Sequence, residues 1–129
     1  MSEFPITPAD WQRAAQEKME SSAFDYYASG ADSETTVVEN IRAWERYQLH
    51  PKVLAGVDQI DTHVEVLGER FSSPVMIAPT AYHKLADPEG ECATARAAAL
   101  AQSVMVVSTL GTTTLERIAE AAPDGRRWF

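Results

Sequence analysis

The length, composition and charge of the chain predict one ordinary globular domain and exclude several classes of protein. Its 129 residues are 45% hydrophobic and 23% charged, and its formal net charge is −8. An acidic chain without a basic cluster is repelled by nucleic-acid phosphates, so we expect no nucleic-acid partner. The longest apolar runs, residues 75–78 and 104–107, are far shorter than the roughly 20 residues of a membrane helix, so we expect no membrane span.

Neither the start of the chain nor its cysteine content indicates export. The N-terminus, Met1-Ser2-Glu3-Phe4-Pro5, lacks the positive and apolar regions of a secretory signal. Cys92 is the only cysteine, which excludes an internal disulfide, and the scattered histidines lack the spacing of a zinc site. We therefore expect a cytoplasmic protein without a metal site.

The first third of the chain predicts helices. Thr7 is a favourable N-cap and Pro8 suits the first helical position. A short second helix is expected over residues 22–28, ending at Gly30. A third helix is expected to start after Asp32 or Ser33.

Residues 49–68 interrupt this helical pattern. Pro51 and Gly56 break helices, and residues 63–67 alternate between apolar and polar like a strand. A turn at Gly68-Glu69 would complete a short hairpin.

From Pro74 onward, short apolar runs alternate with helical patterns. Residues 75–78 and 103–107 predict buried strands, and their separation is close to the roughly 30 residues of a βαβ unit. Between them, Asp87 is the expected N-cap of an alanine-rich helix with Pro88 at its first position. Glu89 and Glu91 are interpreted as acids placed at the positive end of this helix.

The last residues extend the same alternation. Thr113 and Glu116 predict a capping box that opens a second helix. A turn at residues 123–125 is followed by the expected start of a third strand at residues 127–129. The second half of the chain therefore predicts the order β-α-β-α-β.

This alternation predicts an α/β fold, either an open doubly wound sheet or a (β/α)8 barrel. Residues 79–83, after the first strand, contain no glycine, so the dinucleotide-binding fingerprint is missing and the barrel is favoured. A barrel takes roughly 250 residues, so we expect the N-terminal portion of a TIM barrel, incomplete after about two βα units. The expected organisation is a helical segment with a hairpin over residues 1–73 and barrel units over residues 74–129.

In such a barrel, function collects where strands end and βα loops begin. The hydroxyls and backbone amides of the two loops suit hydrogen bonding to a planar polar ring such as a flavin. The alternative is that the hydroxyl side chains only bond to their own loop backbone. The loop residues concerned are Pro79, Thr80, Ala81, Tyr82, Ser108, Thr109 and Leu110.

Several segments resemble a known family in their order along the chain. Residues 26–31 (Tyr-Tyr-Ala-Ser-Gly-Ala), 44–53, 77–81, 88–97 and 108–109 are similar to segments of the FMN-dependent enzymes that oxidise L-2-hydroxy acids. Glycolate oxidases, lactate oxidases and L-lactate dehydrogenases belong to this family. The resemblance covers nearly the whole chain. It implies an FMN-binding (β/α)8 barrel, FMN as the cofactor, and a small 2-hydroxy acid as the substrate.

The resemblance also implies roles for individual residues. Tyr26 matches the tyrosine that donates a hydrogen bond to the substrate carboxylate, and Leu110 falls where a side chain shapes the substrate pocket. Pro79, Thr80 and Ala81 match a loop that lies against the flavin. A further flavin contact is implied for the hydroxyl of Ser108.

The family's catalytic base, carboxylate-binding arginine and phosphate-binding loops correspond to positions beyond residue 129. We therefore expect an N-terminal part that contains no catalytic residue and is inactive alone, with a homo-oligomer among the expectations for a full-length form. Two other hypotheses stay open. The chain could be a short, non-catalytic structural or regulatory product that pairs with another chain, or part of a different FMN barrel enzyme.

Overall fold

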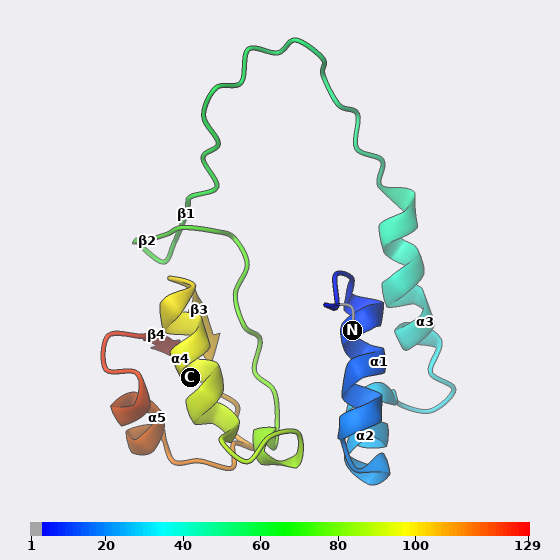
Figure 1. Ribbon diagram of the computed structural model, residues 1–129, viewed down its shortest axis with the longest axis vertical. Coiled ribbons are helices and arrows are strands. Elements are labelled where there is room, and N and C mark those ends of the chain that lie inside the picture. Colours follow the sequence, from blue (N-terminus) through cyan, green and yellow to red (C-terminus); the bar gives the residue numbers. More distant parts are fainter. Residues whose placement is uncertain (1–3) are drawn as a thin grey trace. The chain divides into compact units, whose positions relative to one another are not determined.

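The computed structural model describes residues 4–129 and contains two compact units (Figure 1). The first unit ends at Gln59, and the second comprises Ile60–Phe129. The hairpin therefore belongs to the same unit as the βα elements, whereas the sequence grouped it with the helices in residues 1–73. The interpretation of the N-terminus as lacking a signal peptide rests partly on residues 1–3, which lie outside the described residues.

The first unit contains the three helices that the sequence predicts. They are followed directly by a short 3-10 helix. The elements are α1 (Pro8–Lys18), α2 (Ser21–Ala28), α3 (Thr35–Arg42) and η1 (Ala43–Arg46).

The start of α1 confirms the predicted N-cap. The Asp10 backbone N–H donates to Thr7 Oγ1 at 3.2 Å, and the Asp10 carboxylate accepts from the Thr7 backbone N–H at 2.8 Å. The two residues thus form a capping box, with Pro8 at the first position. A reciprocal cap satisfies donors that the helix itself leaves unpaired, so the local sequence alone specifies where α1 begins.

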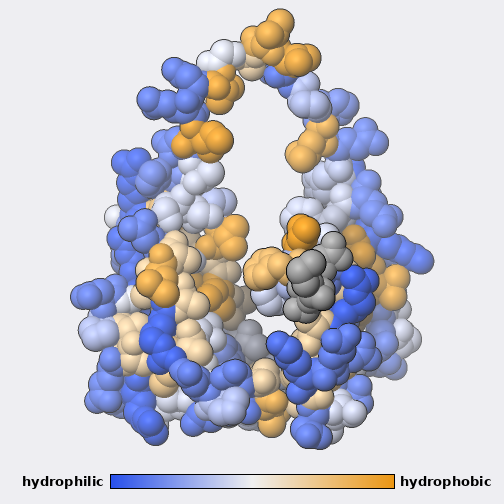
Figure 2. Space-filling view, in the orientation of Figure 1, coloured by the Kyte–Doolittle hydropathy of each residue, from blue (hydrophilic) through white to orange (hydrophobic). Residues whose placement is uncertain are grey.

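Residues 47–63 contain neither a helix nor a strand, and all of them are exposed. Apolar side chains are frequent in this segment, and Figure 2 shows them as orange patches along it. Leu49 is 97% exposed and Val53 92% exposed. The described residues therefore bury almost none of the apolar surface of this segment.

The second unit opens with the predicted hairpin. Strands β1 (Val64–Val66) and β2 (Glu69–Phe71) pair antiparallel. Leu67 and Gly68 form the turn, with φ angles of 53° and 78°, as in a type I′ turn. The predicted turn at Gly68-Glu69 is wrong by one residue, because Glu69 already pairs with Val66.

Parallel pairing brings three segments of the second unit together. Strand β3 (Val104–Val106) pairs with β4 (Arg126–Trp128), and on its other side Ile77 forms a single bridge to Met105. Ile77 donates to Val104 O and accepts from Val106 N, both at 2.9 Å. The predicted strand at residues 75–78 is reduced to this bridge, because its outer edge has no partner strand among residues 4–129. These strands do not close a barrel.

Helices α4 (Gly90–Leu100) and α5 (Leu115–Ala121) pack side by side over this sheet (Figure 1). The buried core between helices and strands consists of small and medium apolar side chains. The small alanine side chains of α4 allow a close approach of this helix to the strands. The cluster comprises Ala95, Ala98, Met105, Val107, Ile118 and Ala122.

Both predicted helix starts in this unit need correction. Helix α4 begins at Gly90 rather than Pro88, and Asp87 instead caps the preceding turn, with its Oδ1 accepting from Glu89 N at 2.8 Å. Gly90 has a φ of +53°, a conformation that glycine adopts without strain, and it separates the turn from the helix. At α5 the N-cap is Thr114, not Thr113.

The hairpin is attached to the last strand of the unit. The Arg126 guanidinium lies 4.7 Å from the centre of the Phe71 ring and donates to the Arg70 carbonyl. The Phe71 and Trp128 rings meet edge to face at 6.0 Å. Phe71 is only 1% exposed. These contacts fix β2 against β4.

Candidate functional site

The loops that follow Ile77 and β3 start at the same edge of the sheet, because the two segments run parallel. Tyr82 N donates to Leu110 O at 3.0 Å, and Lys84 N donates to Thr112 Oγ1 at 3.4 Å. The structure therefore brings loop residues 79–82 together with loop residues 108–112. Five of the six predicted site residues, Pro79, Thr80, Ala81, Ser108 and Leu110, lie in these two loops.

Three backbone amides and the Ser108 hydroxyl are free donors of these loops. Within residues 4–129, the N–H groups of Thr80, Ser108 and Thr109 donate to no protein acceptor. The Thr80 hydroxyl donates to Ala78 O at 3.3 Å, and the Ser108 hydroxyl accepts from Leu110 N at 3.1 Å. Both hydroxyls thus bond to their own loop backbone, as the alternative interpretation predicts, but unpaired amides remain available to a ligand.

This donor set fits one polar edge of a flavin ring and lacks a cationic side chain for a phosphate group. The Ser108 oxygen accepts a hydrogen bond, which leaves its own proton free to donate. Loop residues 79–82 and 108–114 contain no lysine or arginine, so they offer no positive charge to a phosphate. The two loops can therefore provide a wall for the ring only.

Leu110 presents an apolar side chain beside these donors. It is 50% exposed, while its backbone is fixed on both sides, through its N–H to Ser108 Oγ and through its carbonyl to Tyr82 N. Its side chain can therefore contribute to the rim of a pocket from a well-defined backbone position.

Tyr26 lies in the first unit, on α2, so its predicted role toward these loops stays a prediction. It is 48% exposed. Its ring meets the Tyr27 ring edge to face, with 5.2 Å between the ring centres. Tyr27 is half-buried, which is consistent with a packing role.

Sequence reasoning missed the role of Glu91. This carboxylate is 1% exposed. Its Oε1 accepts from Thr112 N at 2.6 Å, and its Oε2 accepts from the hydroxyls of Thr112 at 2.7 Å and Thr113 at 2.8 Å. Burial acts to raise the pKa of Glu91, but these hydrogen bonds outweigh it and lower the pKa to about 2. Glu91 is therefore ionised at neutral pH and fully partnered.

The position of Glu91 in the first turn of α4 is as predicted, but its side chain serves another element. Thr113, expected in a capping box with Glu116, instead donates to Glu91. The only sequence signal was a run of three threonines, residues 112–114, separated from Glu91 by 21 residues. Such a signal does not identify its partner.

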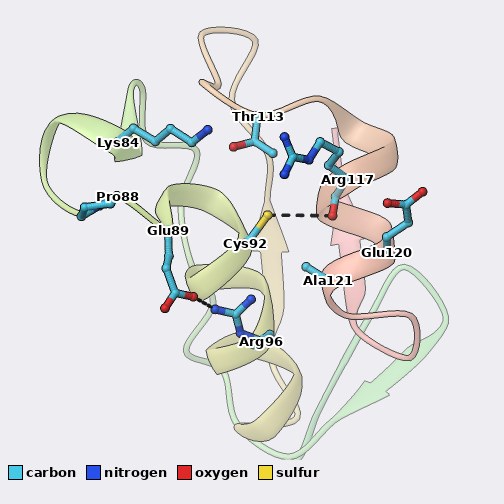
Figure 3. Close-up of a pocket in the computed structure, with 9 residues that line it drawn as sticks. All are labelled: Lys84, Pro88, Glu89, Cys92, Arg96, Thr113, Arg117, Glu120 and Ala121. Atoms are coloured by element: carbon cyan, nitrogen blue, oxygen red, sulfur yellow. Dashed lines mark hydrogen bonds and ion pairs between the residues drawn. The ribbon is translucent and has the colours of Figure 1, made fainter.

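A groove on the helical layer of the second unit includes one residue of the loop after β3, Thr113 (Figure 3). It has a volume of about 430 Å³ between α4 and α5. Glu89 and Arg96 form an ion pair within it, and Cys92 Sγ lies 3.9 Å from Arg117 O. None of the predicted site residues lines it. The lining residues are Lys84, Pro88, Glu89, Cys92, Arg96, Thr113, Arg117, Glu120 and Ala121.

The part of the chain that the structure describes contains neither a membrane-spanning helix nor a cluster of metal-binding side chains. No helix there has the length and apolar character needed to cross a membrane. No group of three or more histidine, cysteine, aspartate or glutamate side chains in residues 4–129 could hold a metal ion.

Comparison with known proteins identifies relatives over nearly the whole chain. The family model described as "FMN-dependent dehydrogenase" matches residues 15–129. "Glycolate oxidase 1" of Zea mays is 45% identical over 120 residues, which cover 93% of this chain and 32% of the maize protein. "2-Hydroxyacid oxidase 2" of Homo sapiens is 42% identical, over 93% of this chain and 34% of the human protein.

The fold also matches solved structures over nearly the whole chain and about a third of each matched protein. A crystal structure of mandelate oxidase matches with a TM-score of 0.87 and 38% identity, over 94% of this chain and 36% of that protein. The chain is thus an α/β segment that corresponds to the N-terminal third of such oxidase structures. It spans about a third of the length of the relatives it matches.

Proposed function

Because the chain belongs to the FMN-dependent dehydrogenase family, we propose that it is the N-terminal part of an enzyme that oxidises an L-2-hydroxy acid to the 2-oxo acid. The observation that carries the proposal is the pair of loops joined by the Tyr82–Leu110 hydrogen bond, with three unpaired amides at one sheet edge. The printed names of the relatives, glycolate oxidase, 2-hydroxyacid oxidase and mandelate oxidase, support this class of substrate.

The proposal assigns a flavin-binding wall to the second unit. Pro79, Thr80, Ala81 and Ser108 would hold the ring of FMN, with the amides of Thr80 and Ser108 facing its polar edge. Bound FMN supplies the electron acceptor for oxidation of the hydroxy acid. The protein's contribution is to bind and orient the ring and to exclude water from the face that meets the substrate.

Two side chains are proposed to contact the substrate. The Tyr26 phenol would donate a hydrogen bond to the substrate carboxylate, and a phenol does this without neutralising the negative charge. Leu110 would limit the size of the side chain on the hydroxy acid. No base is assigned within residues 1–129, so the proposal places proton removal on residues that follow Phe129 in the complete enzyme.

The proposal is tested by reading the coding sequence past codon 129 and assaying its complete product. We expect an open reading frame that continues through further strands to a histidine base. We also expect the purified product to bind FMN, quench its fluorescence, and oxidise glycolate, lactate or mandelate. A product that binds no FMN and oxidises none of these acids would overturn the proposal.

A matched pair of variants tests the role of Tyr26. Tyr26→Phe removes a hydrogen bond to a charged group and should lower kcat/KM by about 10-fold to 100-fold, with little change in the Kd of FMN. Tyr27→Phe is the control and should leave both quantities close to those of the unmodified enzyme. An unchanged kcat/KM for Tyr26→Phe would remove Tyr26 from the site.

The exposed apolar side chains of residues 47–60 favour one second candidate, a non-catalytic chain that pairs with another protein. It predicts a stop codon after codon 129, no FMN binding, and self-association in light scattering. The same reading of the coding sequence separates it from the enzyme.

A further inference from the structure

Glu91 is the one charged side chain that is buried among the described residues. A buried carboxylate is costly unless charge-assisted hydrogen bonds compensate for the loss of water. Here every such bond to its side chain comes from two consecutive residues, Thr112 and Thr113. The α4 carboxylate is therefore directed at one particular loop.

That loop also carries the proposed site residues Ser108 and Leu110. One end of the loop is continuous with β3, and a turn closes it where Gly111 N donates to Ser108 O at 3.1 Å. Glu91 holds the other end at Thr112. Leu110 thus lies between two fixed points, the strand and the Glu91 carboxylate.

The same attachment reaches the neighbouring loop. Leu110 O accepts from Tyr82 N at 3.0 Å, and the Thr112 hydroxyl that contacts Glu91 also lies 3.4 Å from Lys84 N. Movement of Thr112 would therefore disturb both loops at the sheet edge. The space beside Gly111 is also limited, since a Cβ there would lie 3.3 Å from Ser108 O and 3.7 Å from Glu91 Oε1.

We propose that Glu91 is a positioning residue for substrate selectivity, which holds Leu110 at the pocket rim by binding Thr112 and Thr113. The inference rests on the proposed function for its substrate, a 2-hydroxy acid. Glu91 does not touch the substrate or the flavin. It acts only through the backbone of the loop after β3.

The loop itself is tested first, by amide hydrogen exchange on the full chain. Glu91→Gln keeps the shape of the side chain, but its NH2 group cannot accept a hydrogen bond, so one of the two acceptor oxygens is lost. We expect the amides of Tyr82, Gly111 and Thr112 to exchange about 10-fold faster or more, as for loss of a bond to a charged group. The amides of Ile77 and Val106, in the sheet, should keep their rates.

Glu89→Gln is the matched control. Glu89 lies two residues away, next to the start of α4, and its side chain pairs with Arg96 rather than with the loop. We expect this variant to leave exchange in both loops unchanged. If Glu91→Gln fails to fold, Thr113→Val replaces it, because this change removes one donor to Oε2 and leaves the carboxylate in place.

Selectivity is tested in the product of the complete coding sequence. In Glu91→Gln, we expect the ratio of kcat/KM for mandelate to that for glycolate to change by about 10-fold, because misplacement of a pocket residue affects bulky and small substrates unequally. Glu91→Asp keeps the charge on a shorter side chain and should restore part of the ratio. Glu89→Gln should leave the ratio unchanged.

The outcomes of these experiments distinguish a failure of the proposed function from a failure of the role proposed for Glu91. An unmodified product without FMN binding or turnover would overturn the proposed function, and the exchange rates would then still decide whether Glu91 fixes the loop. An active enzyme in which Glu91→Gln lowers kcat/KM equally for both acids would overturn the selectivity role. Uniformly faster exchange throughout the second unit would show that Glu91 serves general stability, and would also overturn the inference.

Discussion

The two units of the chain form regular structure by different means. In the second unit, apolar side chains from two helices and the sheet make a continuous buried cluster. In the described residues of the first unit, Ala23 is the only buried hydrophobic residue, yet three helices form there. Helices can be specified by caps and local propensity, but burial is what fixes one element against another. We therefore expect the units to differ in how strongly single substitutions destabilise them.

A substitution in the buried core should give the largest difference between the units in the free energy of unfolding. Ile118 is fully buried, whereas Ile41 on α3 is 69% exposed. Ile118→Ala should lower the free energy of unfolding by about 2–5 kcal/mol, because it removes buried methyl groups and leaves a cavity. Ile41→Ala should change it by less than about 0.5 kcal/mol. Urea denaturation followed by circular dichroism measures both, and similar losses would contradict the contrast between the units.

A low pH should lower the free energy of unfolding of the second unit, because Glu91 becomes protonated. The pKa of this carboxyl is lowered from 4.5 to about 2, so its contribution to stability is fully present above pH 4.5 and is lost as the pH falls toward 2. One pKa unit corresponds to about 1.4 kcal/mol, and the contribution is therefore roughly 3 kcal/mol.

Urea denaturation from pH 6 to pH 2 measures this loss as the difference between the unmodified chain and Glu91→Gln. The variant should be less stable at pH 6, and the difference should shrink as the pH falls. Glu89→Gln should keep the pH dependence of the unmodified chain. A constant difference between Glu91→Gln and the unmodified chain at all pH values would rule out the proposed linkage.

Substitution of a glycine should have an intermediate effect on the free energy of unfolding. Gly90→Ala places a side chain at a φ of +53°, 2.7 Å from Lys84 Cγ, and should cost about 1–2 kcal/mol from the left-handed conformation alone. Gly56, in the irregular segment, has a φ of +65° with nothing near its missing side chain. Gly56→Ala should cost less, because that segment can change conformation freely. Equal changes in Tm for the two variants would contradict this difference.

The smallest expected effect is a gain in stability from a substitution at the hairpin turn. Leu67 adopts a φ of 53° and is 83% exposed, so its side chain contributes little burial and strains the backbone. Leu67→Asn suits the first position of a type I′ turn and should stabilise the second unit by roughly 0.5–1 kcal/mol. A thermal melt that shows an unchanged or lower Tm would mean that Leu67 makes contacts that offset this strain.

The sequence predicted those elements whose signals are local. The cap at Thr7, the three N-terminal helices, the hairpin and the strands at residues 104–106 and 126–128 all follow from short patterns. The strand predicted at residues 75–78 forms only the single bridge at Ile77. An apolar run indicates burial, but it does not show whether a strand has a neighbour on each side. The predicted start of α4 was also wrong, because the sequence pattern does not distinguish a glycine with the left-handed conformation of Gly90 from an ordinary helical glycine.

The candidate site was predictable only in outline. The rule that function collects where barrel strands end singled out the loops Pro79–Ala81 and Ser108–Leu110, and the structure places these two loops together. It did not predict that the Thr80 hydroxyl would be bonded to its own loop while the Thr80 and Ser108 amides stay unpaired, since this depends on how each loop folds back on itself. Nor did it reveal the link between Glu91 and Thr112, which joins residues far apart in sequence.

The attachment of the hairpin to β4 has a consequence for the time course of biosynthesis. Arg126 follows the carbonyl it binds by 56 residues. At a translation rate of about 5–20 residues per second, Phe71 is made roughly 3–11 seconds before Arg126 and Trp128 can cover it. During that interval the nascent hairpin exposes an aromatic side chain. Molecular chaperones on the ribosome would therefore encounter the uncovered Phe71 before β4 exists.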